Sequence, residues 1–281
     1  MSSSVRALTG ALLLLATLLA ARPAEAGPHD FVVYIARMGG DTATARPYVQ
    51  KFAAQLEKLM GWKPGSAAGA FFADRKEALQ DIKTRQPAFA LLDPPLYFEL
   101  REPSALTLIG QLQSTELVSS KLHLVVKDDK LTSLEALRGA VLTTTLAESP
   151  RYLSKVVFDG KLDAVKHFKL KRVGTALKGV RAVLTGSARA TLVDDDQLAA
   201  ARKMEGGQAL RSIYSSPALP PIPVVAFGKV MKPADQKTLE KALPRLCSGA
   251  GAQTCKDMRL PGFQPKNVTL FAPTQKRYER P

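Results

Sequence analysis

Short apolar runs alternate with stretches of helical periodicity along most of the chain. Runs rich in Val, Ile, Leu and Phe are typical of buried strands. They occupy residues 31–35, 67–72, 88–92, 105–111, 122–126, 141–145, 167–173, 190–193, 210–215 and 222–227. Helices are expected at 44–60, 74–85, 94 onward, 132–139, 149 onward, 175–184, 194 onward and 233–246. Strands that alternate with helices predict an α/β fold built on parallel sheets.

Capping residues set the expected boundaries of several helices. Thr44 is the expected N-cap of the first helix, and Gly61 is the residue that ends it. Asp74 and Asp93 are suited to cap the two helices that follow. The turn Gly39–Gly40 exposes backbone N–H groups before a helix, which is a weak signal for an anion site.

The segment 121–145 combines a strand, a charged turn, a short helix ending at Gly139 and a second strand. Thr132 or Ser133 is the expected cap of that helix. So many elements in so few residues indicate that the chain passes from one βα domain to another in this segment. The chain, at 281 residues, is long enough for two such domains with their own cores.

The N-terminus has the pattern of an export signal. Arg6 precedes the apolar run 7–21, and Ala24 to Ala26 fits a small-x-small cleavage site. We predict a signal peptide at residues 1–26, with cleavage after Ala26 or, alternatively, after Ala24. The apolar run is too short for a comfortable membrane span, and no other segment approaches one. A soluble protein exported to the periplasm is expected.

Charge and cysteine content narrow the classes of partner. The 40 basic and 25 acidic residues give a net charge of +15, but the basic residues are dispersed along the chain. The densest group, 166–172, suits the solvent face of a strand, so specific nucleic-acid binding is not expected. Cys247 and Cys255 are the two cysteines, and in an exported chain we expect them to form a disulfide.

Four stretches carry a resemblance to a known family. They are 88–97, the S-L-x-x-L-x-G motif at 133–139, G-x-x-x-A-x-x-x-D at 186–194, and S-x-P-x-x-P-x-x-P at 215–223. They resemble type 2 periplasmic solute-binding proteins, most of all the phosphate-, phosphite- and phosphonate-binding components of ABC transporters. The resemblance implies two Rossmann-like lobes with a hinged cleft, the periplasmic binding protein type 2 fold. Lobe 1 is expected at 27–123 plus 228–281, and lobe 2 at 124–227.

Candidate ligand-binding residues lie at or just after the ends of predicted strands, because those ends face the crevice in open parallel sheets. Each also has a structural interpretation: N-capping for the aspartates, packing for the tyrosine and β-propensity for the threonines. The expected ligand-binding residues are Asp93, Tyr97, Thr143, Thr144, Thr145, Ser149 and Asp194.

Two departures from the family pattern bear on the ligand. The Ser/Thr pair of that branch leads directly into a helix, whereas 146–148 separate Thr145 from Ser149 here. Asp93 stands where an uncharged first-lobe turn is usual. A carboxylate there would repel a bare oxyanion, so a zwitterionic or cationic ligand is expected.

Catalytic and metal sites are not indicated by the sequence. It has no nucleophile elbow and no phosphate-cradling loop with lysine, and the three consecutive aspartates 194–196 have divergent side chains. We therefore expect no enzyme, no cofactor and no metal. The prediction is a monomeric exported protein that closes two lobes on a small phosphate- or phosphonate-like solute, for an ABC permease or a sensor. The alternative is a basic two-lobed interaction protein whose degenerate cleft binds a polyanion or a partner protein.

Overall fold

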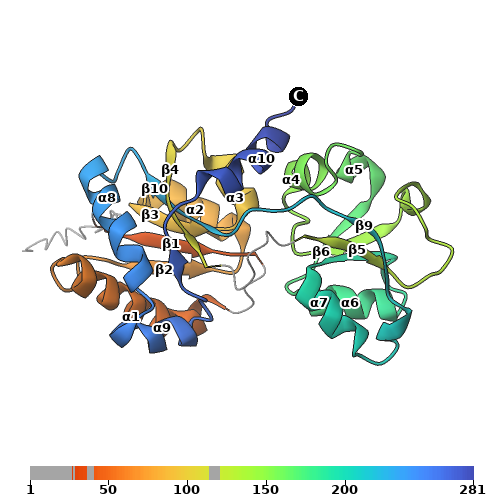
Figure 1. The fold of residues 1–281 in the computed structure, drawn as a ribbon, viewed down its shortest axis with the longest axis horizontal. Helices are drawn as coiled ribbons and strands as arrows, with labels where there is room; N and C mark the ends of the chain where they lie inside the picture. Colours follow the sequence, from red (N-terminus) through yellow and green to blue (C-terminus); the bar gives the residue numbers. More distant parts are fainter. Residues whose placement is uncertain (1–26, 28, 37–40, 114–120) are drawn as a thin grey trace, which may run out of the picture.

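The computed structural model describes residues 27, 29–36, 41–113 and 121–281. These residues form two α/β lobes that lie side by side, each built on one sheet (Figure 1). The expected signal peptide and the Gly39–Gly40 turn lie outside the described residues. The predicted two-lobed α/β architecture is confirmed.

The first lobe contains a six-stranded sheet of order β11-β4-β10-β3-β1-β2. Its strands are β1 (Phe31–Tyr34), β2 (Gly69–Phe72), β3 (Phe89–Leu92), β4 (Leu106–Leu112), β10 (Pro223–Phe227) and β11 (Phe263–Gln264). β1 pairs in parallel with β2 and β3, whereas β10 runs antiparallel to β3 and β4. β10 is the strand that returns from the second lobe, and the short β11 is antiparallel to β4.

The second lobe repeats this arrangement with the order β7-β6-β8-β5-β9. Its strands are β5 (His123–Val126), β6 (Val141–Thr144), β7 (Lys169–Arg172), β8 (Ala190–Val193) and β9 (Arg211–Ser215). β6 is parallel to β7 and β8, while β5, the strand that enters from the first lobe, is antiparallel to β8 and β9. Each lobe therefore holds one crossing strand within its sheet.

Strand pairing differs from the expected lobe boundaries in two places. The boundary at 227 assigned β10 to lobe 2, but β10 pairs between β3 and β4 in the sheet of lobe 1. His123, assigned to lobe 1, begins β5 of the second sheet. The reason is that both crossing strands join the sheet they enter, so the return crossing lies in the proline-rich segment 216–222 rather than after Phe227.

Helices cover both faces of the first sheet. Those of lobe 1 are α1 (Thr42–Met60), α2 (Arg75–Arg85), α3 (Pro94–Leu100), α8 (Pro233–Ala242), α9 (Ala252–Asp257) and α10 (Val268–Tyr278). α1, α8 and α9 share one core with one face of the sheet, and α2 and α3 share another core with the opposite face. The predicted helix to 246 ends earlier, because Pro244 lies in the 3₁₀ turn η4 (Leu243–Arg245) and lacks a backbone N–H. A further 3₁₀ turn, η5 (Gly249–Gly251), precedes α9.

The N-cap of α1 corrects one prediction. Asp41, not Thr44, is the cap, and its carboxylate accepts hydrogen bonds from the Thr44 N–H at 2.8 Å and the Thr44 hydroxyl at 2.6 Å. Thr44 lies inside the first turn, where it donates to the cap. Gly61 ends the helix with φ of 69°, a conformation that favours glycine. Asp74 caps α2 as predicted.

The helices of lobe 2 are mostly short. They are α4 (Pro150–Tyr152), the π-helical turn η2 (Leu153–Val157), α5 (Ala164–His167), α6 (Ala176–Leu184), α7 (Asp195–Arg202), and the 3₁₀ turns η1 (Glu135–Leu137) and η3 (Gly207–Ala209). The predicted helix at 132–139 is only η1, and its N-cap is Leu134 rather than Thr132 or Ser133. The Ser133 hydroxyl, just before it, accepts from the Ala136 N–H at 3.3 Å. The strand expected from His167 starts at Lys169, because Asp163 caps α5 and His167 ends it.

A disulfide joins Cys247 to Cys255, as predicted. The Cα atoms are 5.5 Å apart, within the range that disulfides favour. It ties α9 to the turn that follows α8, on the side of lobe 1 covered by α1. Closing so short a loop stabilises the fold by about 2–3 kcal/mol at most. Among the described helices, none is both long and apolar enough to span a bilayer.

Candidate functional site

A cavity of about 70 Å³ lies between the lobes and is lined from both of them. The ends of β1 and β6, the starts of α3, α6 and α7, and the return crossing all contribute to it. The lining residues are Ile35, Ala36, Asp93, Pro94, Pro95, Leu122, Thr144, Thr145, Leu146, Tyr152, Ala176, Leu192, Asp194, Gln197, Leu219, Pro220 and Ile222. We call this cavity the cleft. One water needs about 10–15 Å³ of such volume, so the cleft has room for about five water-sized groups.

Four of the seven predicted ligand-binding residues line the cleft: Asp93, Thr144, Thr145 and Asp194. They come from the carboxyl ends of β3, β6 and β8, which meet at the lobe interface. This is the geometry expected of ligand crevices in open parallel sheets. Asp93 belongs to lobe 1 and the other three residues to lobe 2, so the cleft brings polar groups from both lobes together.

Asp93 combines a structural role with its place in the cleft. Its carboxylate accepts the Leu96 N–H at 3.0 Å and so caps α3, whose first residue is Pro94. The residue is only 5% exposed. Burial raises the pKa of the Tyr34 hydroxyl well above its ordinary value, and the charge of the nearby Asp93 is the second cause of this increase. The carboxylate thus sits where little water screens it.

Asp194 caps α7 from the edge of the cleft. Its carboxylate accepts the Gln197 N–H at 2.8 Å, and the Gln197 side-chain oxygen accepts the Asp194 N–H at 3.1 Å. This reciprocal capping box holds both side chains at the start of the helix. The amide nitrogen of Gln197 is a hydrogen-bond donor, so the box presents a carboxylate and an amide to the same cavity.

The two cleft threonines follow each other at the end of β6. Thr144 is 1% exposed, and its hydroxyl accepts the Leu146 N–H at 3.1 Å. Its backbone oxygen accepts the Val173 N–H at 3.2 Å, which ties the cleft to the end of β7. Thr145 is half-buried in the loop that follows the strand. A hydroxyl of this kind can donate to an oxyanion or accept from an ammonium group.

The other three predicted residues do not line the cleft, and we leave them out of the proposed site. Thr143 faces the opposite side of β6, where its hydroxyl donates to the Ala190 carbonyl at 3.2 Å. Tyr97 is buried, and its ring packs edge-on to Phe271 with centroids 5.8 Å apart. Ser149 precedes α4 without a side-chain capping bond and lies in a neighbouring hollow.

Two polar lining residues were not predicted from the sequence. Tyr152 lies one turn beyond Ser149, at the end of α4, and its place in the cleft depends on contacts that the local sequence does not show. Gln197 carried a usable signal, because Asp194 followed three residues later by Gln is a capping-box pattern. A glutamine that is held by the cap must lie near whatever the aspartate faces.

The charge of the cleft is opposite to that of the chain. Its described lining includes two carboxylates and no Lys, Arg or His, although the chain as a whole carries +15. The remaining polar groups are hydroxyls and one amide. Such a set can hold an ammonium group at the carboxylates and an oxyanion at the hydroxyl and amide donors. In the part of the chain that the structure describes, no cluster of His, Cys, Asp or Glu is arranged to hold a metal ion.

A hydrogen bond joins the lobes on the β2 and β7 side of the cleft. The Arg172 guanidinium, at the end of β7, donates to the Ala73 carbonyl of lobe 1 at 3.0 Å. Glu148 holds the same guanidinium in an ion pair at 2.9 Å. Arg172 also lies in register with Thr144, so this bridge is one strand away from a cleft hydroxyl. We call the lobe arrangement that contains this contact the bridged orientation.

Comparison with known structures supports the two-lobed fold over most of the chain. A binding protein component of an ABC phosphonate transporter from Pseudomonas aeruginosa is 15% identical, with a TM-score of 0.64, covering 88% of this chain and 84% of its own. PhnD1 from Prochlorococcus marinus, in complex with methylphosphonate, is 16% identical, with a TM-score of 0.63, covering 89% of this chain and 97% of its own. A Xanthomonas citri protein bound to ATP is 13% identical, with a TM-score of 0.68 and coverage of 89% and 95%.

At the level of sequence, comparison with the curated proteins gives no match. One family does match, described as the periplasmic substrate-binding protein of ABC phosphonate transporters, over residues 41–269. The match begins at the cap of α1 and ends within α10, so it includes the whole second sheet and every strand of the first sheet except β1. It covers both crossings and all four predicted residues in the cleft. The chain therefore belongs to the family of periplasmic substrate-binding proteins of ABC phosphonate transporters.

Proposed function

We propose that the cleft binds a small zwitterionic phosphonate, in which an ammonium group and a phosphonate group are a short chain apart. The observation that carries this proposal is the pairing of two carboxylates with hydroxyl and amide donors in one small cavity. The ammonium would lie at Asp93 and Asp194. The phosphonate would lie at Thr144, Thr145 and the amide of Gln197.

Charge and size argue for the zwitterion over free phosphate. A bare dianion would be placed beside two carboxylates in a partly desolvated cavity, where like charges repel strongly. An ammonium group on the solute replaces that repulsion with charge-assisted hydrogen bonds. The volume of the cleft suits a solute of only a few non-hydrogen atoms.

The family supports a role in uptake. Its description names the substrate-binding component of a phosphonate ABC transporter, and one similar structure contains methylphosphonate. We propose that this chain is exported to the periplasm, acts there as a monomer without catalysis, and delivers its solute to a permease or sensor. The N-terminal pattern at 1–26 supports the export step.

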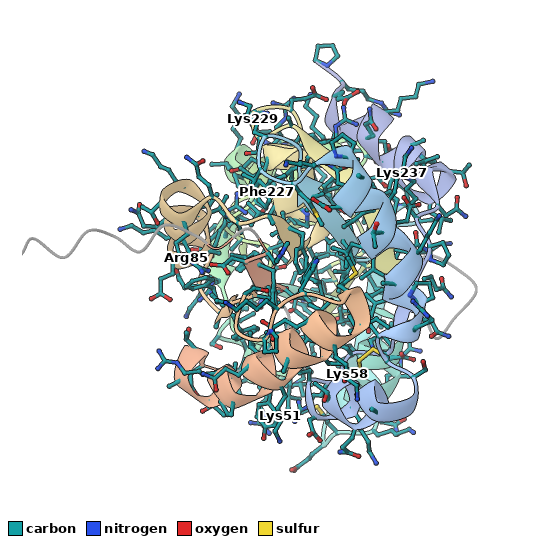
Figure 2. The ribbon with its side chains drawn as sticks, turned by 90° about the vertical axis from the view of Figure 1, so that its left-hand side faces the viewer. Lys51, Lys58, Arg85, Phe227, Lys229 and Lys237 are labelled. Carbon is teal, nitrogen blue, oxygen red and sulfur yellow. A yellow bond between two sulfur atoms is a disulfide. The ribbon has the colours of Figure 1, made fainter. Side chains whose placement is uncertain are left out.

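The distribution of basic side chains argues against the polyanion-binding alternative. Figure 2 shows Lys51, Lys58, Arg85, Lys229 and Lys237 at the end of lobe 1, on α1, α2, the turn after β10, and α8. They are spread over this end of the molecule rather than gathered at one place. Nucleic-acid binding through such charges would be weak and strongly salt-dependent.

Thermal shift and titration calorimetry with matched solutes test the proposal. The set contains 2-aminoethylphosphonate, methylphosphonate, inorganic phosphate and β-alanine. We expect 2-aminoethylphosphonate to bind most tightly, and a hundredfold excess over its Kd to stabilise the fold by about 2.7 kcal/mol. Equal or tighter binding of phosphate would contradict the charge argument. A lack of binding across the set would favour the degenerate-cleft alternative.

A further inference from the structure

The C-terminal helix α10 is anchored on lobe 1. The Asn267 N–H, at its start, donates to the Gln111 side-chain oxygen at 3.2 Å. Phe271 is 3% exposed and packs on Tyr97, while Thr274 is 1% exposed. These buried contacts fix the first half of α10 to the face of lobe 1 that carries α3.

The end of the same helix is held by lobe 2. Asp159 accepts from Arg277 Nε at 3.2 Å and from Arg280 Nη1 at 3.1 Å. The Arg151 guanidinium lies 4.8 Å from the centre of the Tyr278 ring and donates to the Tyr278 carbonyl at 3.2 Å. In Figure 1, α10 lies at the top of lobe 1 beside α4 of lobe 2. The helix thus spans the lobe interface.

Local backbone geometry on lobe 2 fits Asp159 to receive two arginines. Asp159 has φ of 51° and Gly160 has φ of 76°, so the chain turns sharply at the end of η2. The carboxylate is 33% exposed, and its partners Arg277 and Arg280 are 23% and 48% exposed. Partial burial reduces screening of this pair of bonds by salt.

Aromatic packing around Tyr278 also joins the two lobes. The ring of Tyr278 lies 5.8 Å from that of Phe98 in lobe 1 and 6.5 Å from that of Tyr152 in lobe 2. Tyr152 also lines the cleft. A displacement of α10 from lobe 2 therefore removes a packing partner from a cleft residue.

We propose that α10 is an intramolecular clasp that stabilises the bridged orientation of the lobes and thereby strengthens solute binding. This inference rests on the proposed function of the cleft. The helix is fixed to lobe 1 by buried groups, so a rotation of lobe 2 away from lobe 1 must separate Asp159 from Arg277 and Arg280. Contacts present only in the binding-competent orientation raise its population, and apparent affinity follows that population.

The test compares the double variant Arg277→Gln, Arg280→Gln with a charge-matched control, Lys256→Gln, Lys276→Gln. Both control lysines are exposed, and Lys276 lies on the same helix. Two partly buried ion pairs predict a loss of affinity for 2-aminoethylphosphonate of about twofold to thirtyfold in the clasp variant. The control should bind like the unmodified protein. The single variant Asp159→Asn should weaken binding in the same direction.

A second readout needs no solute. Spin labels at Lys76→Cys on lobe 1 and Lys178→Cys on lobe 2, with the native disulfide intact, report the distance between lobes. The clasp variant should show a broader and longer distribution than the control. Unchanged distances together with unchanged affinity would overturn the clasp, as would tighter binding by the clasp variant. If the unmodified protein binds none of the solutes while the distances still shift, the proposed function fails, and of the clasp only its effect on the lobe orientation stands.

Discussion

Asp194→Asn gives the sharpest test of the zwitterion hypothesis, because the substitution removes a charge and keeps the cap. Asparagine and aspartate are about equally good N-caps, so the bond to the Gln197 N–H at 2.8 Å should persist. The change therefore acts on the cleft with little effect on α7. Asp196→Asn is the matched control, since Asp196 is exposed in the same first turn and does not line the cleft.

The magnitude follows from the bond that the solute would lose. A hydrogen bond to a charged group contributes about 1.5–3 kcal/mol, which corresponds to roughly tenfold to 150-fold in Kd. We expect this loss for 2-aminoethylphosphonate. Methylphosphonate has no ammonium group, and removal of a neighbouring negative charge should leave its affinity unchanged or raise it. The ratio of the two affinities is therefore the informative quantity.

Calorimetric titration of both solutes against the two variants and the unmodified protein measures this ratio. Urea unfolding of the same proteins checks the fold: each variant loses a charge near the N-terminus of α7, which costs about 0.3–1 kcal/mol. The reasoning is refuted if Asp194→Asn weakens both solutes equally, because Asp194 would then act on the shape of the cleft and not on an ammonium group. It is also refuted if Asp196→Asn changes the ratio as much.

Three further predictions concern the surroundings of the cleft. Thr145→Val should weaken solute binding by about twofold to tenfold in calorimetry. Thr143→Val should keep the affinity and lower the free energy of unfolding by about 1 kcal/mol. The reverse pattern would show that the site is misplaced. Arg172→Ala should weaken solute binding by about twofold to tenfold and lengthen the spin-label distance between the lobes. Unchanged values would show that the Arg172–Ala73 hydrogen bond does not stabilise the bridged orientation. Burial, and after it the charge of Asp159, raises the pKa of Tyr214 to about 12. Because the unfolded-state pKa is about 10, the stability that this shift contributes is fully present below about pH 10 and is lost as the pH rises from about 10 to 12. Tyr214→Phe should flatten that part of the curve in urea unfolding, and an unchanged slope would contradict the assignment.

The alternation of apolar runs with helical periods was enough to predict the architecture. All ten strands predicted from the sequence are present, although β7 starts two residues later than expected. What the local pattern could not provide was pairing. β10 reads as one more buried strand, and only its hydrogen bonds to β3 and β4 place it in lobe 1.

The limits at the site have a similar cause. Adjacent residues of a strand point to opposite faces, so a run of three threonines cannot all face one cavity, and Thr143 bonds instead to Ala190. Tyr152 and α10 were missed because their importance depends on contacts between segments far apart in sequence. Tyr278 meets Phe98 and Tyr152, which lie in different lobes.

The two sheets show how lobe motion and solute binding can be coupled. β10 lies between β3 and β4, and β5 lies between β8 and β9, so each chain crossing continues directly into a central strand. The return crossing holds Pro217, Pro220 and Pro221, whose fixed φ angles restrict its bending. The covalent chain connections between the lobes are present in every orientation of the lobes, so they do not favour one orientation by breaking or forming. The contacts of α10 with Asp159 and of Arg172 with Ala73 can break, so in the clasp that we propose they help to set how readily the cleft opens.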